Sequence, residues 1–461
     1  MDFDKIIIDG EKLVADDDFK SAMSAVIEDG ENTFVTGSAG TGKTFFLKTL
    51  CKISEKKKIV LAPTGVTAIN AGGSTIHSQF RLPFHPLLMS DNIFRIRVVQ
   101  GDSDKRTIFN SFKYDQGTID LFRELELLII DEVSMVRCDV ITALDWILKV
   151  FRNNYIHPFG GVQVVLIGDP FQLAPIVKTK RRGEEGQGED DILKQGGYGG
   201  RFFFSTFVFR DSRFRSFELK KVRRQRDKKF INLLNNIRNA AVNHNDVQLL
   251  NGRVGLPEDD KGFIYITTTN ARADNRNTAK LNAIDFELHS FQGIIDGVFK
   301  SNDLPAPNKL KLKKGAQIMI LKNLTDSRLK NGTIGVIHEI YSDKIAIKLD
   351  GVSDVFLIKR IEWENIEYRL NPETRSVEEK VIGTFTQFPL RLAWAITVHK
   401  SQGMTFDKVI ADLRDTFTYG QVYVGLSRCT SLEHLYLESQ LNQFQINPHP
   451  RVVEFYRGLE L

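Results

Sequence analysis

Residues 33–46, TFVTGSAGTGKTFF, carry the first side chains whose spacing indicates chemistry. An apolar stretch enters a glycine-rich turn and a helix-like stretch leaves it. The G-x-x-x-x-G-K-[ST] pattern of a P-loop therefore stands between a strand and a helix, as that loop requires. Backbone N–H groups of such a loop, and those at the start of the helix, bind phosphate. A chance glycine-rich turn before a helix is the alternative interpretation.

In a P-loop, Lys43 is expected at the β- and γ-phosphates of a nucleotide and Thr44 at a magnesium ion. The sequence therefore predicts a site for a nucleoside triphosphate with Mg²⁺. The predicted nucleotide contacts in the loop are Gly37, Ser38, Ala39, Gly40, Thr41, Gly42, Lys43 and Thr44.

Two carboxylates follow the apolar stretch 125–130 and provide a second element of the same chemistry. At the carboxyl edge of a sheet, Asp131 could hold magnesium, and Glu132 could orient and deprotonate an attacking water. Taken alone, the pair also suits a strand that ends in a solvated acidic turn. The P-loop upstream favours the catalytic interpretation.

A third apolar stretch, 162–167, leads into GDPFQL, which places Gln172 after another strand. Its neutral amide both donates and accepts, so it could sense the γ-phosphate or the water and relay that state. Arg223 and Arg224 in KKVRRQRDKK and Arg428 in VYVGLSR could stabilise the charge of a transferring phosphoryl group, a role worth about a thousandfold or more in rate. The run 220–229 also suits a solvated basic helix face.

Hydroxyl and imidazole groups stand at strand ends or helix starts in both halves of the sequence. Thr64, His77, His399 and Ser401 are of types that suit contacts to the backbone of a single nucleic-acid strand without reading its bases. A lone histidine is more often structural than functional. The DNA interpretation of the two histidines therefore needs support from the rest of the sequence.

The order of apolar and polar stretches predicts an α/β protein. Strands alternate with helices at 18–71 and again after residue 201, which indicates βαβ units and parallel sheets. The alternation of strands and helices breaks down at 80–118, which is therefore expected to be an insertion that leaves the sheet. Residues 178–200 mix basic, acidic and glycine residues, which favours a flexible surface loop over a binding element. Short alternating stretches at 309–349 predict a small β-barrel inserted in the second half.

Composition excludes several classes of protein. The 461 residues carry a net charge of +5, only a mild bias towards polyanions. The three cysteines are far apart in the sequence, so neither a zinc cluster nor a disulfide framework is predicted, and a reducing compartment is expected. No secretory signal and no membrane-spanning apolar segment are predicted. For a prokaryotic source we expect the cytoplasm, at the nucleoid.

With these residues placed, the sequence resembles the Pif-type (petite integration frequency) DNA helicases of superfamily one, relatives of the RecD and Dda helicases. The stretch from Glu132 to Leu173, where SMV, PFGG and GDPFQL follow one another, is the most specific part of the resemblance. The motifs that carry it, in order, are GSAGTGKT, APTGVTA, GSTIHS, IIDEVSM, GDPFQL, VRRQRD, GAQIMILKN with NGTIG, TVHKSQGMTF and VYVGLSR.

The resemblance implies two RecA-like P-loop NTPase domains with ATP between them, single-stranded DNA across their top and movement in the 5′→3′ direction. It implies a first RecA-like domain at 1–79 and 119–180 with a small wedge at 80–118, and a flexible loop at 181–200. The second RecA-like domain is expected at 201–309 and 381–461, with an SH3-like barrel at 310–380. The partners implied are single-stranded DNA and duplex junctions, bound by a monomer.

The resemblance also assigns roles to residues. Lys43 and Thr44 are expected on phosphate and magnesium, and Asp131 on magnesium. The predicted catalytic residues are Lys43, Glu132, Gln172, Arg224 and Arg428. The predicted DNA contacts are Pro63, Thr64, His77, Thr267, Asn270, His399 and Ser401.

One position departs from the family pattern. Relatives usually place a glutamine that reads the adenine edge ahead of the P-loop, whereas Phe19 stands there in DDDFKSAM. A stacked aromatic ring would hold any base, so selectivity for ATP stays open. The predicted function is an ATP-dependent DNA helicase in DNA repair, recombination and genome maintenance, acting on forks or G-quadruplexes. The alternatives are a nucleic-acid-stimulated ATPase switch that remodels protein–DNA complexes and an RNA helicase of the same superfamily.

Overall fold

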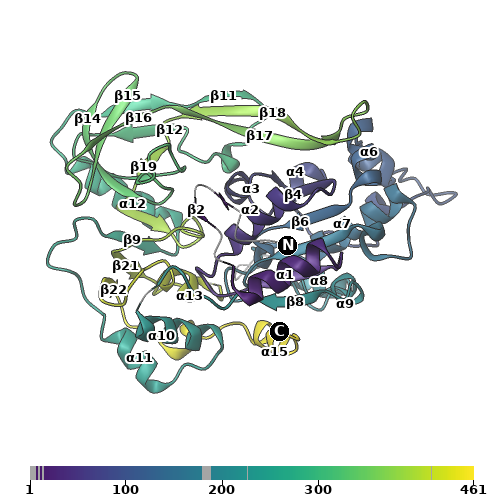
Figure 1. Ribbon diagram of the computed structural model, residues 1–461, viewed down its shortest axis with the longest axis horizontal. Coiled ribbons are helices and arrows are strands. Elements are labelled where there is room, and N and C mark those ends of the chain that lie inside the picture. The colour runs from purple at the N-terminus through teal and green to yellow at the C-terminus, as the bar shows by residue number, and fades with distance from the viewer. Residues whose placement is uncertain (1–6, 9–10, 13–14, 179–187, 226, 417) are drawn as a thin grey trace.

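The glycine-rich loop follows a strand near the edge of a six-stranded parallel sheet (Figure 1). The computed structural model describes residues 7–8, 11–12, 15–178, 188–225, 227–416 and 418–461. In spatial order the strands are β5 (Ser74–Thr75), β4 (Lys58–Ala62), β6 (Leu127–Ile130), β7 (Gln163–Ile167), β3 (Thr33–Thr36) and β8 (Arg215–Glu218). The near-continuous burial of β3, β4, β6 and β7 is that of parallel strands covered on both faces.

Helices cover both faces of this first sheet. On one face, α1 (Asp17–Ile27) and α2 (Lys43–Ile53) pack on the side chains of Val35, Ile129 and Val165. On the other face, α6 (Gln116–Glu124) and α7 (Cys138–Arg152) share a core with alternate residues of the same strands. This division follows from the two-residue period of a strand. The other elements of this half are β1 (Ile7–Ile8), β2 (Glu11–Lys12), α3 (Gly65–Ala71), α4 (Ile76–Gln79), η3 (Val133–Met135), η4 (Pro158–Gly161), α8 (Glu189–Gln195) and α9 (Phe207–Asp211).

The segment 80–118 packs against the first half. It contains η2 (Asn92–Phe94) and α5 (Ile108–Phe112), and several of its apolar side chains join the α7 core. Arg137 fastens the segment by donating to the carbonyls of Phe84 (2.8 Å) and His85 (2.9 Å). The insertion is therefore anchored on the core of the first half.

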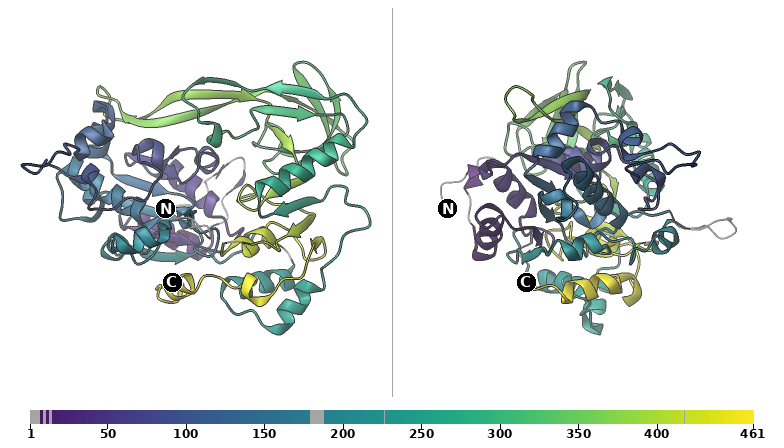
Figure 2. Two further views of the ribbon diagram at one scale, coloured as in Figure 1. Left: turned by 180° about the vertical axis from the view of Figure 1, so that it is seen from behind. Right: turned by 90° about the vertical axis from the view of Figure 1, so that its right-hand side faces the viewer.

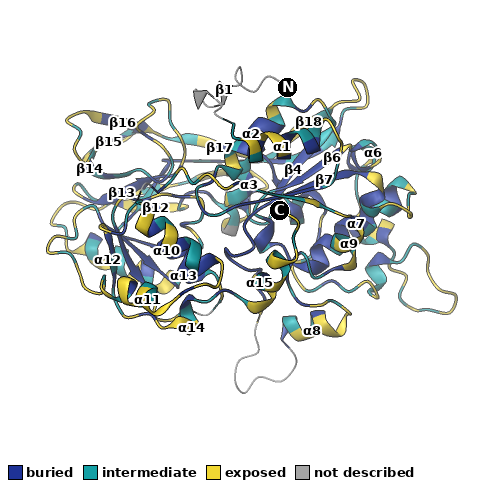
Figure 3. Ribbon diagram, turned by 60° about the horizontal axis from the view of Figure 1, so that its bottom comes forward, coloured by how far each residue is buried: buried dark blue, intermediate teal, exposed yellow. Residues whose placement is uncertain are grey.

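The second half contains a four-stranded parallel sheet, whose strands are buried between helices (Figure 3). Its strands, in spatial order, are β20 (Ala395–Thr397), β9 (Ile264–Thr267), β21 (Val409–Asp412) and β22 (Leu435–Leu437). Its helices are α10 (Lys228–Arg238), α11 (His244–Asn251), α12 (Asn270–Asn282), α13 (Gln421–Leu426), α14 (Gln443–Ile446) and α15 (Pro450–Arg457).

Antiparallel strands form a separate unit above the second sheet. A five-stranded sheet contains β16 (Val355–Lys359), β15 (Lys344–Leu349), β14 (Ile334–Ile340), β13 (Gln317–Ile320) and β19 (Leu390–Leu392). The remaining elements are β10 (His289–Gln292), β12 (Lys309–Leu312), β11 (Ile294–Gly297), η5 (Ser301–Asp303), β17 (Ile361–Leu370) and β18 (Val377–Gln387). The β17–β18 hairpin crosses the top of the molecule to α6 (Figures 1 and 2).

Several elements differ from the expected boundaries. β8 belongs to the first sheet, although 201–309 was expected in the second domain. Antiparallel strands occupy 289–392, beyond the expected 310–380. The apolar run 390–398 divides between two sheets, because the chain crosses from β19 to β20 at Ala393 and Trp394. In the expected loop 181–200, residues 189–195 form α8, and 181–187 lie outside the described residues. Among the helices described, none is long and apolar enough to span a membrane.

A buried glutamine connects the hairpin to the first half. The Gln79 side chain, 3% exposed, donates to the Tyr368 carbonyl (2.9 Å) and accepts from the Tyr368 N–H (2.8 Å). The Gln79 side chain thus pairs both backbone groups of Tyr368 in β17, although Gln79 lies outside the sheet that contains β17. Since an unpaired buried backbone group is costly, this contact fixes where the hairpin crosses.

We predict that Gln79→Leu weakens this crossing by about 1–3 kcal/mol for each backbone group left unpaired. Hydrogen exchange at the Tyr368 amide is expected to accelerate. Gln116→Leu is the control, because its exposed amide donates to Asp120 within α6 (2.9 Å). Unchanged exchange at Tyr368 in Gln79→Leu would contradict the prediction.

Candidate functional site

The glycine-rich loop has a conformation that only glycine adopts easily. Gly40 and Gly42 have φ of 85° and 99°, in the left-handed region. A Cβ at Gly40 would lie 2.5 Å from the Cβ of Arg224, so the loop leaves no room for a side chain there. Lys43 folds over the loop and donates to the carbonyls of Gly37 (2.7 Å) and Ser38 (3.1 Å). The ammonium group is therefore held at the mouth of the predicted phosphate cradle.

The two predicted carboxylates lie where β6 ends. Glu132 has a positive φ of 51°, and its N–H donates to Asp131 Oδ1 (2.9 Å). Burial and the charge of Glu132 raise the pKa of Asp131 to about 7, and burial also raises the pKa of Glu132. Crowded carboxylates at this position suit a divalent cation, since Mg²⁺ prefers oxygen ligands. The Asp131 carboxylate and the exposed Thr44 hydroxyl are the groups that could hold it.

Arg428 is 1% exposed and lies two residues after the end of α13. Its guanidinium donates to the carbonyl of Val424 (2.9 Å), the hydroxyl of Ser427 (2.8 Å) and the carbonyls of Ser401 (3.5 Å) and Met404 (3.4 Å). Among the described residues these acceptors are neutral. Burial, followed by the nearby positive charge of Arg224, lowers the pKa of Arg428 to about 9.

Arg224 lies beside it and also bonds to neutral groups. It donates to the carbonyls of Ser427 and Gly403, both at 3.3 Å, and burial lowers its pKa to about 10. The neighbouring Arg223 N–H donates to the Gly40 carbonyl (2.9 Å). Arg223 and Arg224 therefore lie against the glycine-rich loop, and the Arg224 guanidinium joins that contact to the backbone beside Arg428.

The loop after β7 holds the two halves together through charges that the sequence analysis did not identify. Asp169, fully buried, forms an ion pair with Arg238 of α10 at 3.2 Å. Arg238 also bonds to Glu218 (2.8 Å) and the Tyr456 hydroxyl (3.1 Å), and its guanidinium lies 5.0 Å from the Phe171 ring centroid. Asp169 belongs to the GDPFQL motif, but nothing in the local sequence at the end of α10 marks Arg238 as its partner.

Gln172 in the same loop is 6% exposed, and α13 begins against its backbone. A Cβ at Gly420 would lie only 2.3 Å from the Gln172 carbonyl oxygen. Three residues into α13, the Tyr423 hydroxyl accepts the Ala39 N–H of the glycine-rich loop at 3.0 Å. The short helix α13 therefore contacts both Gln172, the predicted sensor, and the glycine-rich loop, and Arg428 follows it in the sequence. The sequence analysis missed Tyr423.

Of the predicted DNA contacts in the first half, Pro63 and Thr64 follow β4. The Thr64 hydroxyl caps α3 in a reciprocal bond with Thr67. His77 stacks on Phe84 with ring centroids 4.5 Å apart, and burial lowers its pKa to about 4, so the ring is neutral. Phe84 itself is 65% exposed and was not identified from the sequence.

The predicted DNA contacts in the second half lie at the carboxyl ends of β9 and β20. Asn270 is exposed at the start of α12, and His399 is half-buried. Thr267 and Ser401 differ from the prediction, because they are only 3% and 0% exposed. The Thr267 hydroxyl donates to the Thr269 carbonyl (3.0 Å), and the Ser401 hydroxyl donates to the Val398 carbonyl (2.8 Å). These two hydroxyls stabilise turns and do not face an external strand.

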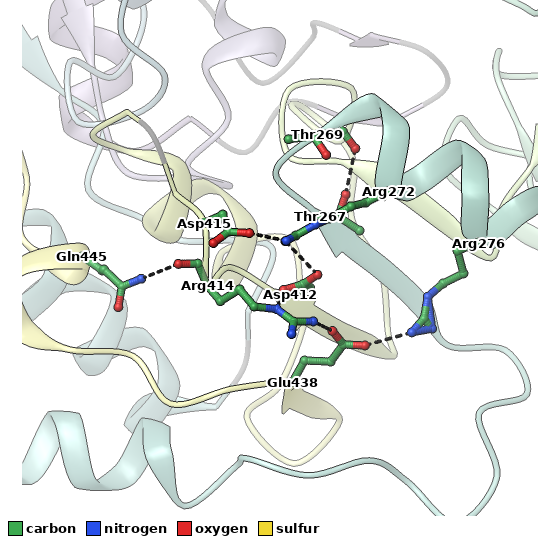
Figure 4. Close-up of polar contacts among 9 residues, drawn as sticks. All are labelled: Thr267, Thr269, Arg272, Arg276, Asp412, Arg414, Asp415, Glu438 and Gln445. Atoms are coloured by element: carbon green, nitrogen blue, oxygen red, sulfur yellow. Dashed lines mark hydrogen bonds and ion pairs between the residues drawn. The ribbon is translucent and has the colours of Figure 1, made fainter. Parts of the chain in front are cut away.

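A chain of alternating charges anchors α12 to the ends of β21 and β22 (Figure 4). Arg272 pairs with Asp412 (3.2 Å) and with Asp415, and Arg276 pairs with Glu438 (2.8 Å). Arg414 joins the two groups by bonding to Asp412 (2.8 Å) and Glu438 (2.6 Å). The network holds the helix start that carries Asn270.

Phe19 does not occupy the position predicted for it. The ring is 4% exposed and lies in the apolar core, 5.3 Å from the Phe46 ring and 6.2 Å from the Phe45 ring between centroids. It is on the apolar face of α1, together with Ala22, Met23 and Val26. The helical period explains this phenylalanine as a core residue, so its ring is not available to stack on a base.

We predict that Phe19→Leu keeps the ratio of the KM values for ATP and GTP within about twofold of the wild-type ratio. The substitution alters a packed core, so the thermal unfolding midpoint is expected to fall, corresponding to about 1 kcal/mol. Steady-state hydrolysis assays with both nucleotides measure the ratio. A selective rise in one KM value would restore the base-stacking interpretation.

Fold and site together define a P-loop protein of two RecA-like halves, in which Arg224 and the Tyr423 hydroxyl contact the glycine-rich loop. The chain belongs to the PIF1-like helicase family. The model of that family matches residues 16–248, and the model described as DNA helicase Pif1, 2B domain, matches residues 300–340.

Known proteins resemble the whole chain. Pif1 of Bacteroides sp, solved in complex with ADP-AlF4, is 37% identical, with a TM-score of 0.84 and 97% of each chain covered. The ATP-dependent DNA helicase Pif1 of Bdellovibrio bacteriovorus is 29% identical over 94% of this chain and 90% of its own length. The ATP-dependent DNA helicase PIF1 of Emericella nidulans is also 29% identical, and this chain spans 62% of its length.

Proposed function

We propose that this protein is an ATP-dependent DNA helicase that moves along single-stranded DNA and separates duplexes. The observation that carries the proposal is the position of Arg224, which lies against Gly40 of the glycine-rich loop and hydrogen-bonds to Ser427, next to Arg428. A site that is complete only when both halves meet can convert nucleotide turnover into relative movement. The relatives named ATP-dependent DNA helicases support DNA as the track.

Each predicted residue has a place in the proposed reaction. The loop N–H groups and Lys43 bind the phosphates, and Thr44 and Asp131 hold Mg²⁺, which supplies charge neutralisation at the phosphoryl oxygens when bound. Glu132 orients the attacking water and accepts its proton. Its raised pKa suits that task, because a base works best when its pKa lies near the operating pH.

The arginines connect nucleotide state to the DNA side of the second half. Arg224 donates to Gly403, and Arg428 donates to Ser401 and Met404, all in the loop that follows His399. A γ-phosphate that draws both guanidiniums inward would therefore displace this loop, and hydrolysis would release it. Separating duplex costs on average about 1.4 kcal/mol per base-pair step, so one turnover can support a step of one base.

The finer features of this function are part of the same proposal. They are Mg²⁺ as the metal, 5′→3′ movement, binding as a monomer, action on forks or G-quadruplexes, and a role in DNA repair and recombination. The candidate DNA contacts Pro63, Thr64, His77, Asn270 and His399 would follow the backbone of the strand.

We predict that duplexes with a 5′ single-stranded tail are unwound in the presence of ATP and Mg²⁺, and that duplexes with a 3′ tail are not. Lys43→Ala is expected to abolish both hydrolysis and unwinding, since it removes the ammonium group that reaches the phosphates in a P-loop. A gel-based strand-displacement assay measures this. Unwinding of the 3′-tailed substrate alone would contradict the direction, and hydrolysis without unwinding would favour the ATPase-switch alternative. The same assay on RNA duplexes tests the RNA-helicase alternative.

We predict that Arg428→Ala lowers kcat for ATP about a thousandfold, because the guanidinium is expected to stabilise the transferring phosphoryl group. Binding of ADP is expected to persist, since the loop of the first half is intact. Arg210→Ala is a matched control, because that guanidinium lies on the exposed Phe207 ring, 4.9 Å from its centroid. A fall of less than tenfold in kcat would remove Arg428 from the catalytic residues.

A further inference from the structure

Gln402 makes a contact that none of the roles above requires. Its side chain belongs to the loop after β20, and its Nε2 donates to Glu132 Oε2 of the first half at 2.9 Å. The two residues are 270 positions apart in the sequence. The catalytic carboxylate therefore accepts a hydrogen bond from the opposite half of the protein.

The same loop leads directly towards the candidate DNA contacts. His399 and Lys400 immediately precede it, and Lys400 is exposed. Its ammonium group lies near the opposite charges of Arg391 and Asp274. An exposed positive charge at the carboxyl end of β20 suits a phosphate of a nucleic-acid backbone.

The loop is also hydrogen-bonded to both arginines. Ser401 and Met404 accept hydrogen bonds from Arg428, and Gly403 accepts one from Arg224. Ser401 is further fixed by its own bond to Val398 (2.8 Å). A displacement at His399 or Lys400 therefore reaches Gln402 within a few residues of stiff backbone.

The chemistry of the contact restrains the base. A donor bonded to a carboxylate oxygen occupies one of its lone pairs and fixes the orientation of the side chain. A hydrogen bond to a charged group is also among the stronger ones in proteins. Glu132 held in this way stays directed towards Gln402 and is less free to turn towards an attacking water.

We propose that Gln402 is a positioning residue that restrains Glu132 while no DNA is bound, and that DNA binding at the His399–Lys400 end of the loop withdraws it. Hydrolysis thereby becomes dependent on DNA. The inference rests on the proposed ATPase activity and adds to it a device that prevents hydrolysis away from the track.

The test measures ATP turnover by Gln402→Leu, which keeps the approximate volume and removes the donor. DNA-free kcat is expected to rise about tenfold, equivalent to about 1.4 kcal/mol. With saturating oligothymidylate, kcat is expected to stay within about twofold of wild type, so the stimulation ratio falls about tenfold. KM for ATP is expected to stay unchanged. The affinity for oligothymidylate, measured by fluorescence anisotropy, is expected to rise, because DNA no longer has to break the bond to Glu132.

Two further variants make the result specific. Gln402→Asn carries an amide on a side chain one methylene shorter, so it is expected to behave as Gln402→Leu does and serves if that variant folds poorly. Gln445→Leu is the matched control, because it also loses an Nε2 bond in the second half, to the Arg414 carbonyl at 3.0 Å. Its stimulation ratio is expected to equal that of wild type.

Several outcomes would overturn the inference. If Gln402→Leu lowered turnover equally with and without DNA, Gln402 would position Glu132 for catalysis and would not restrain it. An unchanged stimulation ratio would show that Gln402 does not connect DNA binding to hydrolysis. Wild-type turnover that DNA does not stimulate would overturn the inference alone. Absence of any wild-type turnover would overturn the proposed function, and this inference with it.

Discussion

Buried positive charge is the constraint on which this structure depends. Arg428 is buried and Arg224 half-buried, and the hydrogen-bond acceptors of both among the described residues are neutral oxygens, while Lys43 lies on carbonyls of its own loop. Burying a charge is costly unless an opposite charge or strong hydrogen bonds compensate it. The charges of Glu132 and Asp169 act on Lys43 and on Arg428. A triphosphate bound at the loop would add to that compensation.

The contacts between the halves keep these charges in place. Parallel strands bring their carboxyl ends to one edge, so the glycine-rich loop, Asp131 and Asp169 meet although they are far apart in sequence. The buried pair Asp169–Arg238 and the bond from Ala39 to Tyr423 then join that edge to the second half. Breaking such a pair would leave an uncompensated buried charge, which makes the contact selective for one arrangement.

The β17–β18 hairpin is a second connection between distant parts. It begins in the antiparallel unit that interrupts the second half and ends on α6 of the first half, where Arg369 pairs with Asp115 (3.1 Å). Gln79 pairs with its backbone at Tyr368, the residue before Arg369. The hairpin therefore couples the antiparallel unit to the insertion next to α6. Movement between the halves must bend or displace it.

The sequence by itself determined the four central strands β3, β4, β6 and β7 of the first sheet and the glycine-rich loop, and it predicted Lys43, Asp131, Glu132 and Arg428 as site residues, because these depend on short spacings and on local hydrophobic period. Only the tertiary structure decided the contacts between residues hundreds of positions apart, such as Gln402 with Glu132 and Arg238 with Asp169, since nothing in either local pattern specifies its partner. It also decided the burial of Phe19, Thr267 and Ser401 and the transfer of β8 to the first sheet. Exposure and sheet membership depend on what packs against a segment, and that packing is a property of the whole fold.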